Sequence, residues 1–167
     1  MQLILGVDPG LAATGYALLR EPAEVVVCGT IRTPAGAPPG ARLDQIRREL
    51  SVVLGGVAEA ALEELFMGAN RTSAIGVAQA RGVVLQLLAE RGIETAEYKP
   101  SQVKQTVTGY GMADKSQLGR MLARQVRGAD PETDHAADAI AVALCHLRSR
   151  RVLRMAVGTG RGTSPLG

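Results

Sequence analysis

The pattern of hydrophobic and polar positions predicts a sheet at the start of the chain. Residues 3–7 form an apolar run that ends at Asp8 and is followed by Pro9-Gly10. Such a run is typical of a buried central strand, so Asp8 should stand at the carboxyl end of that strand. Two further strand-like runs follow at residues 14–19 and 24–31, and the short first connection predicts a hairpin. We therefore expect three antiparallel strands here.

Two long helices are predicted by apolar positions that recur every three or four residues. The first begins at Arg42 and ends at Gly55-Gly56, and its outer face is charged. The second begins at Asn70 or Thr72, either of which can cap it, and runs to about Arg91. Because this second helix is apolar on most sides, we expect one of its faces on the sheet and another against a second subunit.

The segment between these helices carries conflicting signals. Its Ala, Glu and Leu residues favour a helix, whereas the surrounding pattern requires a strand that returns to the sheet. We assign a strand to residues 61–66, with Glu63 and Glu64 near its carboxyl end. Residues 92–97 predict a fifth strand. The expected fold class is therefore α/β, a mixed five-stranded sheet of three antiparallel and then parallel strands, flanked by helices.

Three more helices are predicted in the rest of the chain. Pro100 fits the first turn of one helix, Asp114 and Gln117 have capping-box spacing for the next, and the last helix begins near Asp130-Pro131. Beyond residue 150 the chain is rich in Arg, Gly and Thr. We therefore expect one domain over residues 1–150 and a basic, disordered tail over residues 151–167.

The composition excludes some classes of protein and permits others. A net charge of +3 and a pI of about 9.2 allow an anionic partner without requiring one. Cys28 and Cys145 have no metal-ligand spacing, so we expect both to be reduced packing residues. The amino terminus lacks the basic region of a signal peptide, and no apolar run reaches membrane-spanning length. We therefore expect a cytoplasmic protein with no membrane partner.

Acidic residues are predicted to meet at one edge of the sheet. They are Asp8, one of Glu63 and Glu64, and Asp138 together with Asp134 or His135, which lie three or four residues before it on the last helix. A turn-forming role explains Asp8 on its own. A favourable interaction with the helix dipole explains Asp134 well but Asp138 poorly. The pattern therefore favours a cluster of carboxylates over separate structural roles.

Such a cluster predicts chemistry with metal ions. Three carboxylates at close quarters repel one another strongly unless cations lie among them. Oxygen ligands with at most one imidazole favour Mg²⁺ or Mn²⁺ over Zn²⁺. Two such ions can activate a water molecule and stabilise the leaving oxygen of a phosphodiester. The cluster is therefore typical of a nuclease.

Basic and aromatic side chains are predicted near the same edge. Lys104 and Lys115 lie on either side of one glycine loop, Gly109-Tyr110-Gly111, which contains Tyr110. A single Lys is usually a solvated side chain, but a loop between helix ends beside a sheet edge favours contact with a phosphate. We therefore expect these three side chains to contact a phosphate-bearing partner.

The motifs resemble those of the RuvC family of Holliday junction resolvases over about residues 3–147. Any one motif is weak, but their order and spacing make the resemblance specific. The motifs are Ile4-Leu5-Gly6-Val7-Asp8-Pro9-Gly10 with Thr14-Gly15-Tyr16, Leu62-Glu63-Glu64-Leu65-Phe66-Met67 with Asn70, Gln79-Ala80-Arg81-Gly82, Val103-Lys104-Gln105-Thr106-Val107, Lys115-Ser116-Gln117, and His135-Ala136-Ala137-Asp138-Ala139.

The resemblance implies a fold, an activity and partners. The fold would be ribonuclease-H-like, and the protein would be a homodimer that resolves four-way DNA junctions by symmetric paired nicks in recombination and repair. Each active site would hold two Mg²⁺ ions, for which Mn²⁺ would substitute. The RuvA–RuvB branch-migration complex would be a partner.

The resemblance also assigns roles to residues. It selects Glu63 over Glu64, because the family's glutamate stands three residues before the Phe, and it favours His135 over Asp134. The implied catalytic residues and metal ligands are Asp8, Glu63, His135 and Asp138. The DNA contacts expected from the loop and from the resemblance together are Phe66 at the junction centre, Asn70, Lys104, Tyr110 and Lys115. Position 135 varies in the family, since many members have Asp there and others have His.

Two other classes of protein share parts of this pattern. Actin-like ATPases also have an Asp followed by glycines in their first hairpin, but they need two such domains, and 167 residues are too few. A junction-binding protein without nuclease activity would keep an empty cluster of carboxylates, which only destabilises a fold. A nuclease accounts for the carboxylates better than either class.

Overall fold

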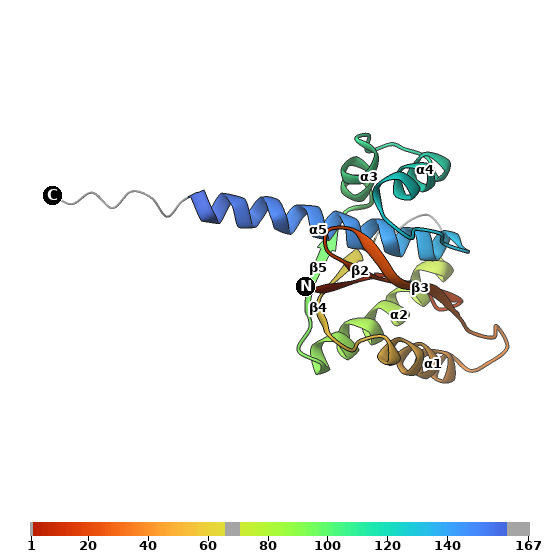
Figure 1. Cartoon of the computed structure of the whole chain (residues 1–167). Coiled ribbons are helices and arrows are strands. Elements are labelled where there is room, and N and C mark those ends of the chain that lie inside the picture. Colours follow the sequence, from red (N-terminus) through yellow and green to blue (C-terminus); the bar gives the residue numbers. More distant parts are fainter. Residues whose placement is uncertain (1, 66–70, 160–167) are drawn as a thin grey trace.

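The computed structural model describes residues 2–65 and 71–159 and contains a five-stranded sheet with helices on both faces (Figure 1). The strands are β1 (Leu3–Asp8), β2 (Ala13–Arg20), β3 (Glu24–Arg32), β4 (Val57–Glu63) and β5 (Glu94–Tyr98). They lie in the order β3-β2-β1-β4-β5. Because β1 is antiparallel to β2 and parallel to β4, the expected mixed α/β sheet is confirmed.

The helices form a layer on each face of the sheet, as Figure 1 shows. The layer below the sheet in that view is α1 (Pro39–Val52) and α2 (Arg71–Glu90), and the layer above it is α3 (Pro100–Thr108), α4 (Lys115–Gln125) and α5 (Asp134–Thr159). Successive side chains of a strand point to opposite faces. Ile4 accordingly packs in the cluster with α5, and Leu5 packs in the cluster with α1 and α2. The central strand β1 is therefore buried on both faces.

Two glycines allow α5 to lie directly on the sheet. A Cβ atom at Gly6 would collide with the backbone carbonyl oxygen of Ala139, and a Cβ atom at Gly15 would collide with that of His135. The first turns of α5 therefore touch the backbones of β1 and β2. This close contact fixes the height of the helix above the end of β1.

The largest differences from the expected boundaries are in β4 and α5, and α1 begins three residues earlier than expected, at Pro39. β4 spans Val57–Glu63 and not residues 61–66, because its backbone pairs with β1 from Leu3 onward, and this pairing overrides the helical preference of its Ala and Glu residues. α5 begins at Asp134 and not near Asp130. The hydroxyl of Thr133 accepts a hydrogen bond from the backbone N–H of Ala136 and so caps the helix there.

The other predicted ends agree more closely with the structure. Asp114 forms the expected capping box with Gln117 at the start of α4. α5 continues to Thr159 and so extends into the segment assigned to the tail, while the domain boundary at residue 150 stays a prediction.

Within residues 2–65 and 71–159, no helix is both long enough and apolar enough to cross a membrane.

Candidate active site

Asp8 and His135 meet where β1 ends beneath the first turn of α5. Asp8 is the last residue of β1, and its neighbour in β2 is Gly15, on which the His135 backbone lies. The Nδ1 atom of His135 is 2.6 Å from Oδ2 of Asp8. When the carboxylate accepts a hydrogen bond from Nδ1–H, a neutral imidazole keeps a free lone pair on Nε2. The Nε2 atom of His135 can therefore bind a metal ion or accept a hydrogen bond from a water molecule.

Glu63 and Glu64 have different surroundings although they are adjacent in the chain. Glu63 is the last residue of β4, which runs parallel to β1, so its half-buried side chain stands at the same sheet edge as Asp8. Glu64 is exposed and lines a separate groove with Lys99 and Ser101. The structure therefore brings Glu63, and not Glu64, to the cluster of carboxylates.

Asp138 and Asp134 also differ in exposure. The Asp138 side chain is 28% exposed, and its Oδ2 atom is 3.8 Å from Nζ of Lys115. The Asp134 side chain is 72% exposed and forms the shorter ion pair with the same Lys115 Nζ, at 3.0 Å. Asp138 therefore belongs to the half-buried cluster, whereas Asp134 lies on its rim.

The pKa values of Asp8, Glu63 and Asp138 are all raised, mainly by burial. The pKa of Glu63 is raised from 4.5 to about 7, mainly by burial and then by the charges of Asp138 and Asp8. Burial is also the main reason that the pKa values of Asp8 and Asp138 are raised, and for Asp138 the charge of Asp8 comes next. The cluster is therefore an environment in which an added cation is stabilised.

Two lysines approach the same carboxylates from the helical layer. The positive charges of Lys104 on α3 and Lys115 on α4 both lower the pKa of Glu63, although they do not outweigh its burial. The hydrogen bond that Lys115 donates to Asp134 raises the pKa of Lys115. Burial lowers this pKa, but by less. The expected pair of basic side chains is thus brought to the edge of the site.

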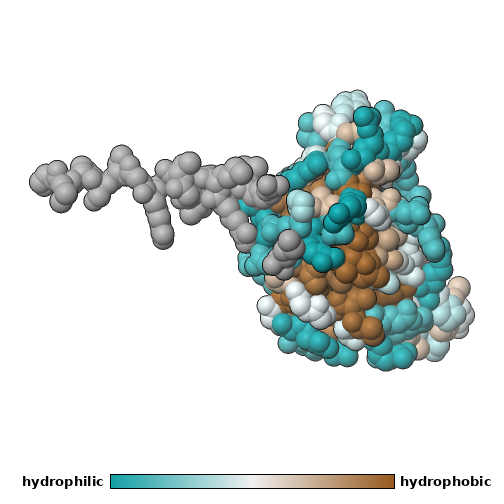
Figure 2. Space-filling view, in the orientation of Figure 1, coloured by the Kyte–Doolittle hydropathy of each residue, from teal (hydrophilic) through white to brown (hydrophobic). Residues whose placement is uncertain are grey.

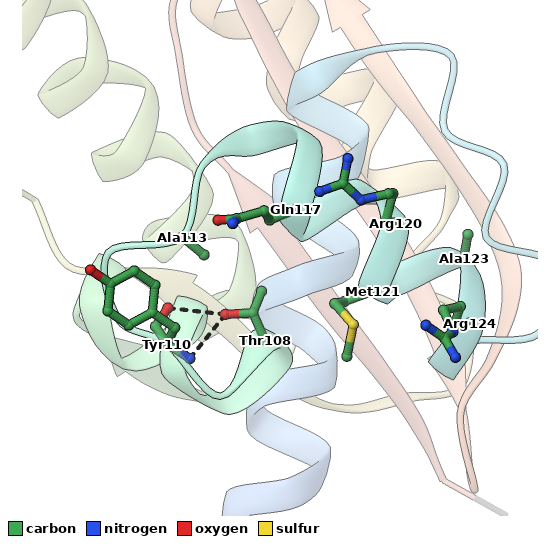
Figure 3. A pocket seen from close by; sticks show the side chains of 8 residues that line it. All are labelled: Thr108, Tyr110, Ala113, Gln117, Arg120, Met121, Ala123 and Arg124. Atoms are coloured by element: carbon green, nitrogen blue, oxygen red, sulfur yellow. Dashed lines mark hydrogen bonds between the residues drawn. The ribbon is translucent and has the colours of Figure 1, made fainter.

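Tyr110 lines a groove between the α3–α4 loop and α4 (Figure 3). The groove has a volume of about 470 Å³ and is lined by Thr108, Tyr110, Ala113, Gln117, Arg120, Met121, Ala123 and Arg124. Residues 99–127 contain six Lys or Arg and one Asp, a net charge of +5, compared with +3 for the whole chain. The segment that carries this groove, Lys104 and Lys115 is therefore more basic than the chain as a whole.

A family model matches residues 4–146, and its description is crossover junction endodeoxyribonuclease RuvC. The chain belongs to the RuvC family. A RuvC of Syntrophomonas wolfei is 46% identical over 156 residues, which cover 89% of this chain and 90% of that protein. A RuvC of Azorhizobium caulinodans is 43% identical, with coverage of 88% and 90%. This RuvC-family protein is therefore an endonuclease.

Solved structures agree with this assignment. The structure described as Thermus thermophilus RuvC in complex with Holliday junction substrate has a TM-score of 0.84 and 29% identity, and the match covers 91% of this chain and 96% of that one. The yeast mitochondrial Holliday junction resolvase has a TM-score of 0.65 at 12% identity, with coverage of 92% and 81%, and shares the fold. The expected fold of the junction resolvases is thus confirmed for this RuvC-family chain.

Two of the expected DNA contacts of this RuvC-family protein cannot be placed. Phe66 and Asn70 lie outside the described residues. Leu65, the last described residue before them, follows the end of β4 and is 38% exposed. The roles of Phe66 and Asn70 stay predictions.

The side chains fit a hard divalent cation by their chemistry and charge. Three carboxylates and one imidazole supply mainly oxygen donors, as Mg²⁺ and Mn²⁺ prefer. After burial, the negative charges of neighbouring carboxylates contribute to the raised pKa values of Glu63 and Asp138. In residues 2–65 and 71–159, however, no three His, Cys, Asp or Glu side chains are arranged so that they could hold an ion. The contact between Asp8 and His135 uses Oδ2 and Nδ1, so His135 would ligate through Nε2.

The sequence did not predict the position of Arg81 beyond its place in the Gln79–Gly82 motif. In the structure, Arg81 is 9% exposed and donates a hydrogen bond of 2.6 Å from Nη1 to the backbone carbonyl of Glu63. The signal that could have identified it is an Arg on the inner face of a helix, next to the buried Ala80 and Val84.

Proposed function

We propose that this protein cuts four-way DNA junctions by hydrolysing phosphodiester bonds at the cluster of Asp8, Glu63, His135 and Asp138. The observation that carries the proposal is the convergence of three carboxylates from β1, β4 and α5 beside two lysines. This arrangement offers ligands for cations and positive charge for a phosphate at one place. A RuvC-family relative of similar fold has been solved with a Holliday junction substrate.

The RuvC family is metal-dependent, and we propose two Mg²⁺ ions per site, with Mn²⁺ as a substitute. Asp8, Glu63 and Asp138 would hold the ions through their carboxylate oxygens, and His135 would add a nitrogen or orient a water molecule. Bound ions would activate a water molecule and stabilise the leaving oxygen of the phosphodiester.

The remaining steps depend on the side chains of the chain itself. Lys104 and Lys115 would bind the phosphate oxygens beside the scissile bond and stabilise the charge that develops on them. Lys115 forms an exposed ion pair with Asp134, and a phosphate would replace Asp134 as its partner. Tyr110, whose side chain lies in the groove of Figure 3, Phe66 and Asn70 would contact the strands around the cut.

A homodimer would present two such sites to a junction that has approximate two-fold symmetry. α2 carries a suitable surface, because Ile75 is 60% exposed and the neighbouring Ala78 and Gly82 are exposed on the same face. Figure 2 shows an apolar patch over this helix. Burying it against the same face of a second copy would relate the two active sites by a two-fold axis and permit symmetric paired nicks.

The wider setting of the proposed activity is homologous recombination and DNA repair in the cytoplasm. The RuvA–RuvB branch-migration complex would deliver the junction to the dimer. Both statements rest on membership of the RuvC family.

The experiment is cleavage of a labelled four-way junction, compared with a duplex of matched sequence, in Mg²⁺, Mn²⁺ or chelator. We expect cleavage of the junction alone, in either metal, at paired positions in strands of like polarity, and none in chelator. An Asp8→Asn variant should still bind the junction but not cut it, because the lost carboxylate serves metal binding and chemistry. Binding by the wild-type protein without cleavage in both metals would instead indicate a junction-binding protein.

A further inference from the structure

The side chain of Arg81 joins α2 to the ends of two strands. Its side chain is 10% exposed. Nη1 donates a hydrogen bond to the backbone carbonyl oxygen of Glu63 at 2.6 Å, and Nη2 forms an ion pair with Oε2 of Glu97 at 2.6 Å. One guanidinium therefore contacts the last residue of β4 and a residue near the end of β5.

The backbone at Glu63 needs such a contact because the sheet ends there. The pairing between β4 and β1 stops at Leu62, one residue before Glu63, and the pairing with β5 stops at Glu63 itself, opposite Tyr98. After that, the hydrogen bond from the Glu64 N–H to the Tyr98 carbonyl continues the alignment. A side chain that holds the Glu63 carbonyl therefore limits rotation of the backbone where the Glu63 carboxylate leaves the sheet.

We infer that Arg81 is a positioning residue that orients Glu63 for metal binding by holding its backbone carbonyl. The inference rests on the proposed function, in which the Glu63 carboxylate is a metal ligand. Arg81 acts on the far side of the residue from the carboxylate and needs no contact with metal or DNA.

The choice of Arg at this place supports a positioning role over simple packing. A buried cation must be paired to offset its lost hydration, and an apolar side chain of similar volume often stabilises a fold as well or better. The residues around Arg81 on the inner face of α2, Ala80 and Val84, are indeed apolar. The planar guanidinium instead supplies two directional donors to two strands at once, which the single ammonium of Lys cannot do in the same geometry.

The test compares four variants of the full chain. Arg81→Met removes both contacts, Arg81→Lys keeps the charge, and Glu97→Gln removes the ion pair but leaves Arg81 and the Glu63 carbonyl in place. Val84→Ala weakens the packing of the same helix without touching Glu63 and controls for lost stability. The readouts are Mn²⁺ binding to the DNA-free protein by calorimetry, the Mg²⁺ dependence of single-turnover junction cleavage, and junction binding in chelator.

We expect Arg81→Met to weaken Mn²⁺ binding by about 10–100-fold and to shift the Mg²⁺ dependence to higher concentration. This is the usual effect of losing a side chain that orients a metal ligand. Junction binding in chelator should be unchanged. Arg81→Lys should fall between Met and wild type, and it carries the test if the Met variant does not fold. Glu97→Gln and Val84→Ala should bind Mn²⁺ within about threefold of wild type.

Wild-type Mn²⁺ affinity in both Arg81 variants would overturn the inference, as would an equal loss in Val84→Ala, which would reduce the effect to stability. A Glu63→Gln variant separates this failure from a failure of the proposed function. If Glu63→Gln loses Mn²⁺ binding and cleavage while the Arg81 variants keep both, only the role of Arg81 is wrong. If Glu63→Gln keeps both, the proposed function of the cluster is itself wrong.

Discussion

At the scale of single residues, Glu63 and Glu64 have the same chemistry but different surroundings. Glu63 is half-buried beside Asp8 and Asp138, and Glu64 is exposed in another groove. We expect Glu63→Gln to abolish junction cleavage, because an amide cannot supply the negative charge that binds the cation. Glu64→Gln, the matched control, should retain it. Single-turnover cleavage in Mg²⁺ measures both, and an inactive Glu64 variant beside an active Glu63 variant would contradict the proposed cluster.

Glu63 also makes stability depend on pH. Its pKa rises from 4.5 to about 7 on folding, mainly through burial. The folded protein therefore binds this proton more tightly than the unfolded chain, so the stabilisation is complete below about 4.5 and is lost as the pH rises through about 7. Without divalent cations, the free energy of unfolding should fall by up to about 3 kcal/mol from this group as the pH rises from about 5 to 8.

Urea unfolding in chelator at several pH values tests this dependence. Glu63→Gln has no such proton to release, so its stability should change less over the same range. Glu64→Gln should follow the wild type. Parallel curves for the wild type and Glu63→Gln would show that the Glu63 carboxyl is not the group responsible.

His135 and Asp134 provide another residue-scale contrast. His135 lies 2.6 Å from Asp8, whereas Asp134 is an exposed partner of Lys115. We expect His135→Ala to lose most of the cleavage rate, His135→Asp to keep much of it as a carboxylate ligand, and Asp134→Ala to lose little. Cleavage rates at fixed Mg²⁺ distinguish these outcomes. Full activity in His135→Ala, together with loss in Asp134→Ala, would reverse the assignment.

At the scale of elements, the contact between α5 and the sheet depends on glycine. A Cβ at Gly6 would meet the Ala139 carbonyl oxygen, which belongs to rigid backbone. Gly6→Ala should therefore push α5 away from β1 and lower the stability by about 1–3 kcal/mol or more. It should also reduce metal binding, because Asp8 and Asp138 lie on the two elements that would separate.

Gly119→Ala is the matched control for this prediction. Gly119 lies within α4, with open space where a Cβ would be added. Since Ala is preferred to Gly inside a helix, this variant should be unchanged or more stable by about 0.5–1 kcal/mol. Thermal unfolding compares the two, and a Gly6→Ala variant as stable as the wild type would mean that α5 does not lie on β1 as closely as described.

At the scale of the whole molecule, the exposed face of α2 is the proposed contact between subunits. Ile75→Glu adds a charge to that face and should shift the protein from dimer to monomer, because a charge buried there would lose its hydration. Val52 on α1 is 82% exposed and offers the matched control Val52→Glu, which should stay dimeric. Light scattering after gel filtration measures the mass. An Ile75→Glu dimer would place the interface elsewhere.

The sequence by itself determined the local elements and the family. The apolar run up to Asp8, the capping box at Asp114 and Gln117, and the order of the RuvC-family motifs depend on residues close together in the chain, so they are readable without a fold. The start of β4 was misplaced, because hydrogen bonds to β1 and not local preference decide where that strand begins.

Only the tertiary structure decided how the site is assembled. The resemblance already selected Glu63 over Glu64, and the structure supplies the physical reason, because Glu63 is half-buried at the end of β4 whereas Glu64 is exposed beyond it. The contacts of His135 with Asp8 and of Arg81 with Glu63 join residues 127 and 18 positions apart. Such contacts depend on the direction of side chains on elements packed together, and no pattern along one element contains that information. The sequence therefore specified the chemical groups of the site, and the packing of α2 and α5 on the sheet specified their arrangement.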